Sequence, residues 1–133
     1  MVALSDAVAS NERIASTFPK GLVAVFVGGT SGVGEYTIKA FAKYTRGSRA
    51  YIIGRSEPNA TRILAECRAL GPNNTFEFFQ GDISLLKTVD DICKRIRAKE
   101  TAINILFQTQ GSMAFSECES PYVVFLETGR FFI

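Results

Sequence analysis

The sequence of 133 residues contains no histidine and only three cysteines. Without histidine, a Ser-His or Cys-His catalytic pair is excluded. Cys67, Cys93 and Cys118 stand far apart, and this separation does not match the familiar zinc-ligand spacings. We therefore expect no metal site, and we expect the three thiols to be buried in the reducing cytosol.

Long apolar runs and blocks of charge are also missing. No stretch approaches the about 18 apolar residues that would indicate a membrane-spanning helix, and residues 1–10 carry Asp6 where a secretion signal would be basic and then apolar. The 15 Lys and Arg residues are scattered among 13 Asp and Glu residues, so no basic patch favours nucleic acid. We expect a cytoplasmic protein that binds neither membrane nor nucleic acid.

The sequence does contain enough apolar residues, 47%, for one packed domain. Apolar runs of strand length cover residues 22–27, 50–53, 75–79 and 103–107. Helical periodicity follows the first three runs, and it is clearest at residues 60–70 and after Ser84, a predicted N-cap. This alternation predicts an α/β fold, the N-terminal half of a Rossmann-type, doubly wound parallel sheet with helices on both faces.

A short helix is expected before the first strand. Ser5 can cap it, the helix would run to about Ala15, and residues 19–21, Pro-Lys-Gly, would end it. Val8 and Ile14 are available for packing. We interpret residues 1–20 as a docking arm.

The first strand ends at a glycine-rich turn, Gly28-Gly29-Thr30-Ser31-Gly32-Val33-Gly34. A turn that opens a helix suits a phosphate-bearing cofactor, because unpaired N–H groups and the helix dipole favour negative charge there. Gly28 would permit the tight exit from the strand, Gly32 the approach of the pyrophosphate, and Gly34 close packing of the helix. Thr30 and Ser31 would add hydroxyl donors, and Val33 completes the predicted cradle. A turn without a ligand is the alternative.

The spacing Gly-x-x-x-Gly-x-Gly resembles the short-chain dehydrogenase/reductase family, although Val27 replaces the family's usual threonine before the first glycine. The matching pieces extend over residues 22–113, and a helix before the first strand resembles fungal biosynthetic members. The resemblance implies an oxidoreductase that uses a nicotinamide cofactor for hydride transfer between carbonyl and alcohol.

The resemblance also indicates which cofactor is bound. Arg55 and Ser56 follow the second strand, about 20 residues past the turn, where an acidic residue would bind a ribose 2′-hydroxyl and an arginine a 2′-phosphate. Arg55 therefore points to NADP. A solvated loop arginine is the alternative.

Two later turns complete the predicted cofactor site. Asp82 and Ile83, after the third strand, look like the family's element that contacts the adenine, although Asp82 could instead belong to the entry turn of the next helix. After the fourth strand the family's Asn-Asn-Ala-Gly is replaced by Gln-Thr-Gln-Gly, in which Thr109 and Gly111 are expected to face the cofactor.

The family's catalytic pair, a tyrosine followed four residues later by a lysine, is absent. The residues four positions after Tyr36, Tyr44, Tyr51 and Tyr122 are Ala40, Ser48, Arg55 and Leu126. We therefore assign no catalytic residue and expect the chain as it stands to be inactive.

Residues 117–133 lack the pattern of the long helix expected after the fourth strand. They contain Pro121 and an apolar run at 122–126. We expect a dinucleotide-binding half-domain over 21–116 and an atypical tail over 117–133, in a truncated member whose fourth strand is an open sheet edge. Alternatively, residues 122–126 form a strand that covers this edge.

Three functions follow from these expectations. The first is an NADP-dependent oxidoreductase with a role in secondary-metabolite biosynthesis, inactive in this form. The second is an NADP-binding sensor or interaction module without catalysis, and the third is a nonfunctional fragment. The small-molecule substrate and the oligomeric state cannot be assigned from the sequence.

Overall fold

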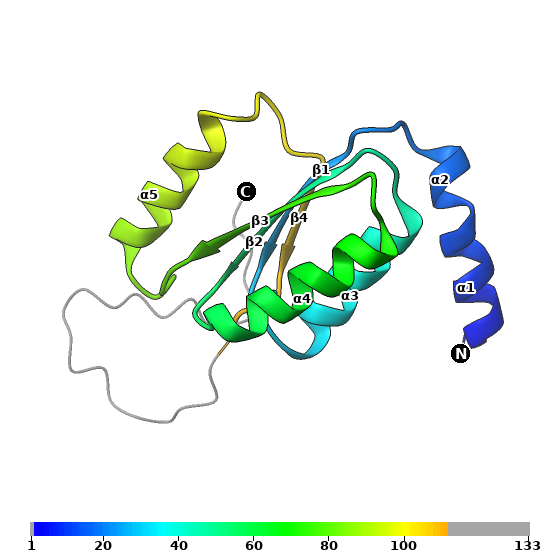
Figure 1. Ribbon diagram of the computed structural model, residues 1–133, viewed down its shortest axis with the longest axis horizontal. Coiled ribbons are helices and arrows are strands. Elements are labelled where there is room, and N and C mark those ends of the chain that lie inside the picture. The colour runs from blue at the N-terminus through cyan, green and yellow to red at the C-terminus, as the bar shows by residue number, and fades with distance from the viewer. Residues whose placement is uncertain (1, 112–133) are drawn as a thin grey trace.

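A computed structural model of the chain describes residues 2–111 (Figure 1). Helices and strands alternate after a helical N-terminal arm. In chain order the elements are α1 Leu4–Glu12, α2 Ile14–Thr17, β1 Val23–Val27, α3 Gly32–Tyr44, β2 Arg49–Gly54, α4 Glu57–Leu70, β3 Thr75–Gln80, α5 Leu86–Arg97 and β4 Ile105–Gln108.

The four strands form one parallel sheet in the order β3-β2-β1-β4. In the register, Phe26 of β1 lies between Ile52 of β2 and Phe107 of β4. The chain adds β2 and β3 on one side of β1 and then crosses over to add β4 on the other side. The predicted parallel α/β sheet is confirmed, and β4 is an edge strand among the described strands.

Two apolar layers enclose the sheet, as expected for parallel strands. Helices α3 and α4 cover one face and α5 covers the other (Figure 1). Alternate residues of β1 point to opposite layers: Phe26 packs with Ile38 and Ile63, while Val25 packs with Ile92. All five residues of β1 are buried, in agreement with the continuous apolar run.

Asn74 fastens the end of α3 to the sheet. Its Oδ1 accepts a hydrogen bond from the backbone N–H of Ser48 at 2.9 Å. Its Nδ2 donates to the carbonyl oxygens of Ala42 at 3.0 Å and Thr45 at 3.2 Å. One buried amide thus satisfies backbone groups in the last turn of α3 and in the loop that follows it.

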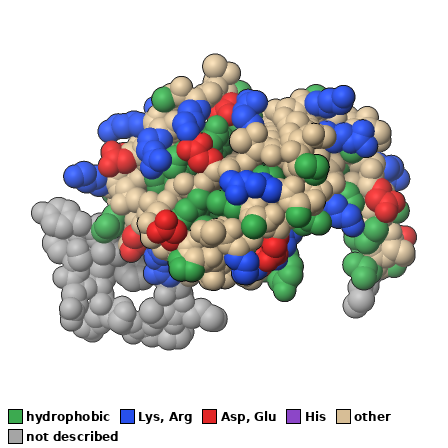
Figure 2. Space-filling view, viewed as in Figure 1, with side chains coloured by type: hydrophobic (Ala, Val, Ile, Leu, Met, Phe, Trp, Pro, Cys, Tyr) green, Lys and Arg blue, Asp and Glu red, His purple; other side chains and the backbone are tan. Residues whose placement is uncertain are grey.

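Ion pairs join α3 to α4 on the outer surface. Arg62 of α4 contacts Glu35 of α3 at 2.8 Å and Glu66 of its own helix at 2.9 Å. Lys39 closes the network by contacting Glu35 at 2.6 Å and Glu66 at 2.5 Å. Elsewhere on the face drawn in Figure 2, basic and acidic side chains are intermixed.

Three local expectations were wrong. Ser5 lies inside α1, whose N-cap is Ala3, because the helix begins two residues earlier than predicted. Ser84 does not cap α5, because the N-cap is Leu85 and the N–H of Ser84 donates to the side chain of Asp82. Cys67 is buried as expected, but Cys93 is exposed on α5.

Neither helix of the N-terminal arm contains a buried residue. The predicted continuous helix is divided at Arg13 into α1 and α2. In residues 2–111 no helix is long and apolar enough to span a membrane. The predictions for Cys118, for the tail over 117–133 and for a strand at 122–126 concern residues outside those that the structure describes.

Candidate functional site

The carboxyl ends of the four parallel strands meet at one edge of the sheet (Figure 1). The strand order reverses at β1, because β2 and β3 lie on one side of it and β4 lies on the other. A crevice at such a switch point is where open α/β sheets bind ligands. The loops after β1 and β4 contain the glycine turn and residues 109–111, which makes this edge the candidate site.

Two glycines of the turn adopt left-handed backbone conformations. Gly28 has φ +84° and Gly32 has φ +53°. A Cβ on Gly28 would lie 2.8 Å from the backbone nitrogen of Gln110, and a Cβ on Gly34 would lie 2.5 Å from the carbonyl oxygen of Gly28. These two positions are therefore filled by neighbouring backbone, as predicted for a tight turn and close helix packing.

Gly32 is different, because an added Cβ would meet no atom within 4 Å. The backbone at the start of α3 is thus open on the side of this glycine. Ser31 precedes the helix in an extended conformation, and its hydroxyl does not cap the first turn. Free N–H groups at the start of a 13-residue helix favour an anion.

The side chain of Thr30 packs against β2. A Cβ on Gly54 would lie 2.6 Å from Cγ2 of Thr30, so the turn after β1 rests directly on the end of β2. A side chain at Gly29 would also meet a neighbour, since an added Cβ would lie 2.5 Å from Cδ1 of Ile38. Gly29 and Gly54 were absent from the predicted site. The adjacent glycines at 28 and 29, and the glycine that ends the second apolar run, were the available signals.

Thr109 braces the turn from β4. Its backbone N–H donates to the carbonyl oxygen of Val27 at 2.9 Å, and its hydroxyl lies 3.3 Å from the carbonyl oxygens of both Val27 and Gly28. This hydroxyl supplies a side-chain hydrogen bond at a turn where Val27 offers none. Gly111 is exposed and has open space at its Cβ position.

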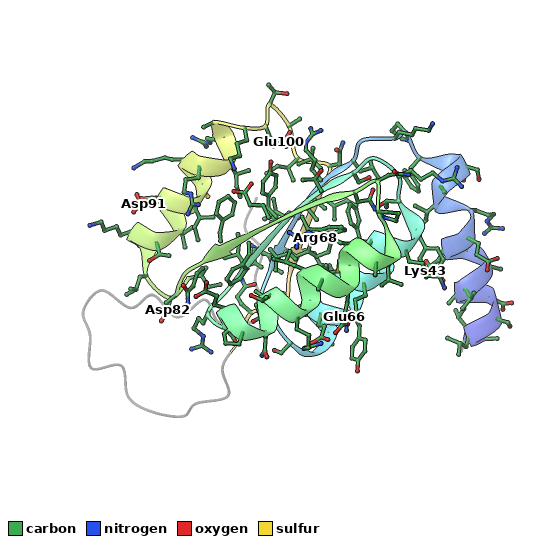
Figure 3. All side chains as sticks on the ribbon, in the orientation of Figure 1. Lys43, Glu66, Arg68, Asp82, Asp91 and Glu100 are labelled. Atoms are coloured by element: carbon green, nitrogen blue, oxygen red, sulfur yellow. The ribbon has the colours of Figure 1, made fainter. Side chains whose placement is uncertain are left out.

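Arg55 and Asp82 lie at the ends of neighbouring strands β2 and β3. Figure 3 shows Asp82 at the same edge as the start of α4. The carboxylate of Asp82 accepts a hydrogen bond from the N–H of Ser84 at 3.0 Å. That bond lowers the pKa of Asp82, and the positive charge of Arg55 lowers it further. The Arg55 side chain is exposed, whereas its carbonyl accepts a hydrogen bond from Gln80 at 3.2 Å.

Three other residues of the predicted site are Ser56, Ile83 and Val33. The hydroxyl of Ser56 caps α4 by accepting from the N–H of Asn59 at 3.4 Å. Ile83 is partly buried against the core layer beneath α5. Val33 is exposed in the first turn of α3. The structure thus brings the glycine turn and Thr109 together at the switch point, with Gly111 two residues beyond Thr109, while Arg55 and Asp82 lie farther along the same edge.

Tyr51 is held away from this edge. Its hydroxyl donates to Glu100 at 2.7 Å, and Glu100 lies at the opposite end of the sheet from Asp82 (Figure 3). Burial and this carboxylate raise the pKa of Tyr51 to about 12. Tyr51 is therefore bound into a structural cluster.

The residues present fit a nicotinamide dinucleotide. The open backbone at Gly32 and the uncapped start of α3 suit a pyrophosphate, and an arginine follows β2. Within residues 2–111 no group of three or more potential metal ligands was found. The backbone groups at the start of α3 are therefore the feature of this edge best suited to an anion.

Comparison with known proteins supports this interpretation. A family model described as short chain dehydrogenase matches residues 22–121. Oxidoreductase andH of Emericella variicolor is 42% identical over 112 residues, which are 84% of this chain and 33% of the relative. An oxidoreductase of Emericella nidulans is 38% identical over 114 residues, 86% of this chain and 34% of the relative. The chain thus spans about a third of the length of these relatives.

Solved structures share the fold. An L-sorbose reductase from Gluconobacter frateurii, complexed with NADPH and L-sorbose, superposes with a TM-score of 0.62 at 20% identity, over 70% of this chain and 34% of that protein. An NADH-dependent reductase complexed with NAD gives a TM-score of 0.61 at 23% identity, over 71% of this chain and 38% of that protein. Together with the match over residues 22–121, the cradle at the switch point places this chain in the short-chain dehydrogenase family.

Proposed function

We propose that this chain binds NADP(H) and forms the cofactor-binding part of an oxidoreductase that interconverts a carbonyl and an alcohol. The observation that carries the proposal is the open glycine turn at the β1–β4 switch point, with Arg55 at the carboxyl end of the next strand. The relatives named oxidoreductases support the reaction class. When bound, the cofactor supplies or accepts the hydride.

The chain's own residues would hold the cofactor by its charge. The N–H groups at the start of α3 would bind the pyrophosphate, which the open side of Gly32 allows to approach. Gly34 and Thr109 would keep the turn in this shape. Neither contributes a charge, so their role is positioning.

Arg55 favours NADP over NAD. Residues 54–56, Gly-Arg-Ser, contain no carboxylate that could accept hydrogen bonds from a ribose 2′-hydroxyl. The nearby carboxylate of Asp82 is already engaged with the N–H of Ser84. The exposed guanidinium of Arg55 would therefore pair with a 2′-phosphate.

The chain as given would not turn over substrate, because no tyrosine in its 133 residues has a lysine four positions later. We also propose a role in secondary-metabolite biosynthesis, which rests on the resemblance of the helix before the first strand to fungal biosynthetic members of the family. The short-chain dehydrogenase/reductase drtF of Aspergillus calidoustus is one fungal relative, 34% identical over 104 residues.

Isothermal titration calorimetry with NADP+ and NAD+ tests the binding proposal. We expect saturable binding of NADP+ and binding of NAD+ that is at least about tenfold weaker, since the 2′-phosphate adds charge-assisted hydrogen bonds. Equal affinities would contradict the assignment to NADP, and absence of binding to either would contradict the cofactor function. Oxidation of NADPH by a carbonyl substrate would overturn the prediction of inactivity.

A further inference from the structure

Gln110 carries a buried polar atom that the fold leaves unused. Its side-chain oxygen Oε1 has almost no solvent-accessible surface and no hydrogen-bond partner, although the residue as a whole is only partly buried. No other side-chain nitrogen or oxygen in residues 2–111 shares this property. An unpaired buried oxygen is destabilising relative to a satisfied one, so a hydrogen-bond donor brought by a ligand would be stabilising.

The backbone places Gln110 at the glycine turn. Its nitrogen would lie 2.8 Å from a Cβ on Gly28, so the two residues are in backbone contact. The hydroxyl of the preceding residue, Thr109, lies within hydrogen-bond distance of the carbonyl oxygens of Val27 and Gly28. Gln110 therefore lies where the loops after β1 and β4 meet, inside the candidate site.

The chemistry of an amide oxygen narrows the ligand group. An amide oxygen accepts hydrogen bonds and does not donate them, so it cannot pair with a phosphate oxygen. The donors on a dinucleotide are the ribose hydroxyls and the amino groups of the adenine and the nicotinamide. Gln110 is therefore complementary to a nucleoside part of the cofactor.

The strand order indicates which nucleoside this is. Arg55 follows β2 and Asp82 follows β3, on one side of β1, whereas Gln110 follows β4 on the other side. A cofactor whose 2′-phosphate lies at Arg55 and whose pyrophosphate lies at the start of α3 would extend its second ribose toward the loop after β4.

We propose that Gln110 positions the cofactor by accepting a hydrogen bond from a hydroxyl of the second ribose, the one that bears the nicotinamide. This inference rests on the proposed function. It also predicts that the unpaired oxygen destabilises the protein when no cofactor is bound.

Three probes separate the parts of the cofactor: NADP+, 2′-phospho-ADP-ribose, which retains the second ribose without nicotinamide, and adenosine 2′,5′-bisphosphate, which lacks the second ribose. Their dissociation constants are measured by calorimetry for the 133-residue chain and for Gln110→Leu. We expect the variant to bind the first two about 3- to 10-fold more weakly, as for the loss of one hydrogen bond, and the third without change. Without ligand, Gln110→Leu should melt at a higher temperature.

Gln108→Leu is the matched control, because Gln108 is an exposed glutamine on the adjacent end of β4. It should change neither affinity nor the ligand-dependent melting shift. Gln110→Met keeps the length of the side chain without its amide and should reproduce the effects of Gln110→Leu. If Gln110→Leu does not fold, Gln110→Met replaces it in the same measurements.

Equal losses for all three probes, or no loss for any, would overturn the ribose contact. A loss of affinity for NADP+ alone would place Gln110 at the nicotinamide and would also overturn the ribose contact. A lower melting temperature of Gln110→Leu in the absence of ligand would show that the side-chain oxygen already has a hydrogen-bond partner, which contradicts the inference. If the unmodified chain binds none of the probes, the proposed function fails too. If it binds NADP+ through Arg55 but Gln110→Leu has no effect, only this inference fails.

Discussion

Gly34, in the first turn of α3, packs directly against the carbonyl oxygen of Gly28, and a Cβ on Gly34 would lie 2.5 Å from that oxygen. The hydroxyl of Thr109 would lie 2.8 Å from the same Cβ. Even a methyl group would therefore push α3 away from the end of β1. The third glycine of the motif is required by the packing of the protein itself, and the second is not.

Gly34→Ala and Gly32→Ala should consequently separate stability from binding. We expect Gly34→Ala to lower the free energy of unfolding by about 2–3 kcal/mol, because neighbouring backbone must shift. Gly32→Ala should cost about 1–2 kcal/mol through its left-handed φ, and its methyl group would project into the open space at the start of α3. Urea unfolding and NADP+ titration of both variants measure the two effects.

We expect Gly34→Ala to have the lower free energy of unfolding of the two variants. Gly32→Ala should lose more affinity for NADP+ than its smaller loss of stability would explain. Unchanged NADP+ affinity in a folded Gly32→Ala would contradict a pyrophosphate at this turn.

Arg55→Asp should reverse the cofactor preference. The substitution removes the cation for the 2′-phosphate and introduces a carboxylate that can bind ribose hydroxyls. We expect NADP+ affinity to fall by about 10- to 100-fold, as for charge-assisted hydrogen bonds, and NAD+ affinity to be kept or improved. Calorimetry with both nucleotides is the measurement.

Arg68→Asp provides the control for net charge, since Arg68 is an exposed arginine near the C-terminal end of α4, away from the carboxyl ends of the strands (Figure 3). Equal weakening by the two substitutions would mean that only overall charge matters.

The ion-pair network between α3 and α4 should make stability depend on acidic pH. Hydrogen bonds from Arg62 and Lys39 lower the pKa of Glu35 from 4.5 to about 2. In the unfolded chain Glu35 takes up its proton near pH 4.5, while in the folded protein it stays ionised to about pH 2. The stabilisation is therefore complete above about pH 4.5 and is lost as the pH falls toward 2.

Urea unfolding between pH 6 and pH 3 tests this expectation with Glu35→Gln. The variant should be less stable at pH 6 and should lose less stability than the unmodified chain as the pH falls. Asp91→Asn is the control, because Asp91 is exposed and its contact with Lys94 is long, 3.8 Å. Parallel pH profiles for Glu35→Gln and the unmodified chain would show that the network does not stabilise the fold.

Asn74→Ala should destabilise the protein strongly. The substitution leaves the N–H of Ser48 and the carbonyl oxygens of Ala42 and Thr45 without their side-chain partner in a buried site. We expect a loss of about 2–4 kcal/mol in the free energy of unfolding. Asn73→Ala, at the exposed neighbouring position, should change it by less than about 0.5 kcal/mol. Similar losses for the two variants would contradict the role of the buried amide.

The elements near the sheet could be predicted with few errors because their signals are local. The buried strand at 22–27 and the helical stripe that contains Ile63 and Cys67 depend on residue type and spacing alone. The errors occur where neighbouring side chains compete. Ser84 is a residue type that often caps helices, yet its N–H donates a hydrogen bond to the side chain of Asp82. Helix α5 begins only at Leu86.

The sequence by itself determined the parallel α/β class, the glycine cradle and the arginine after β2, since each follows from periodicity or from residues close together in the chain. Only the tertiary structure decided which glycines are sterically required, that Thr109 braces the turn, and that Gln110 keeps an unpaired oxygen beside it. Thr109 and Gln110 are about 80 residues from the turn in sequence. Their contacts exist because β4 crosses over to lie beside β1, and no local pattern specifies where a side chain lies once two distant loops meet.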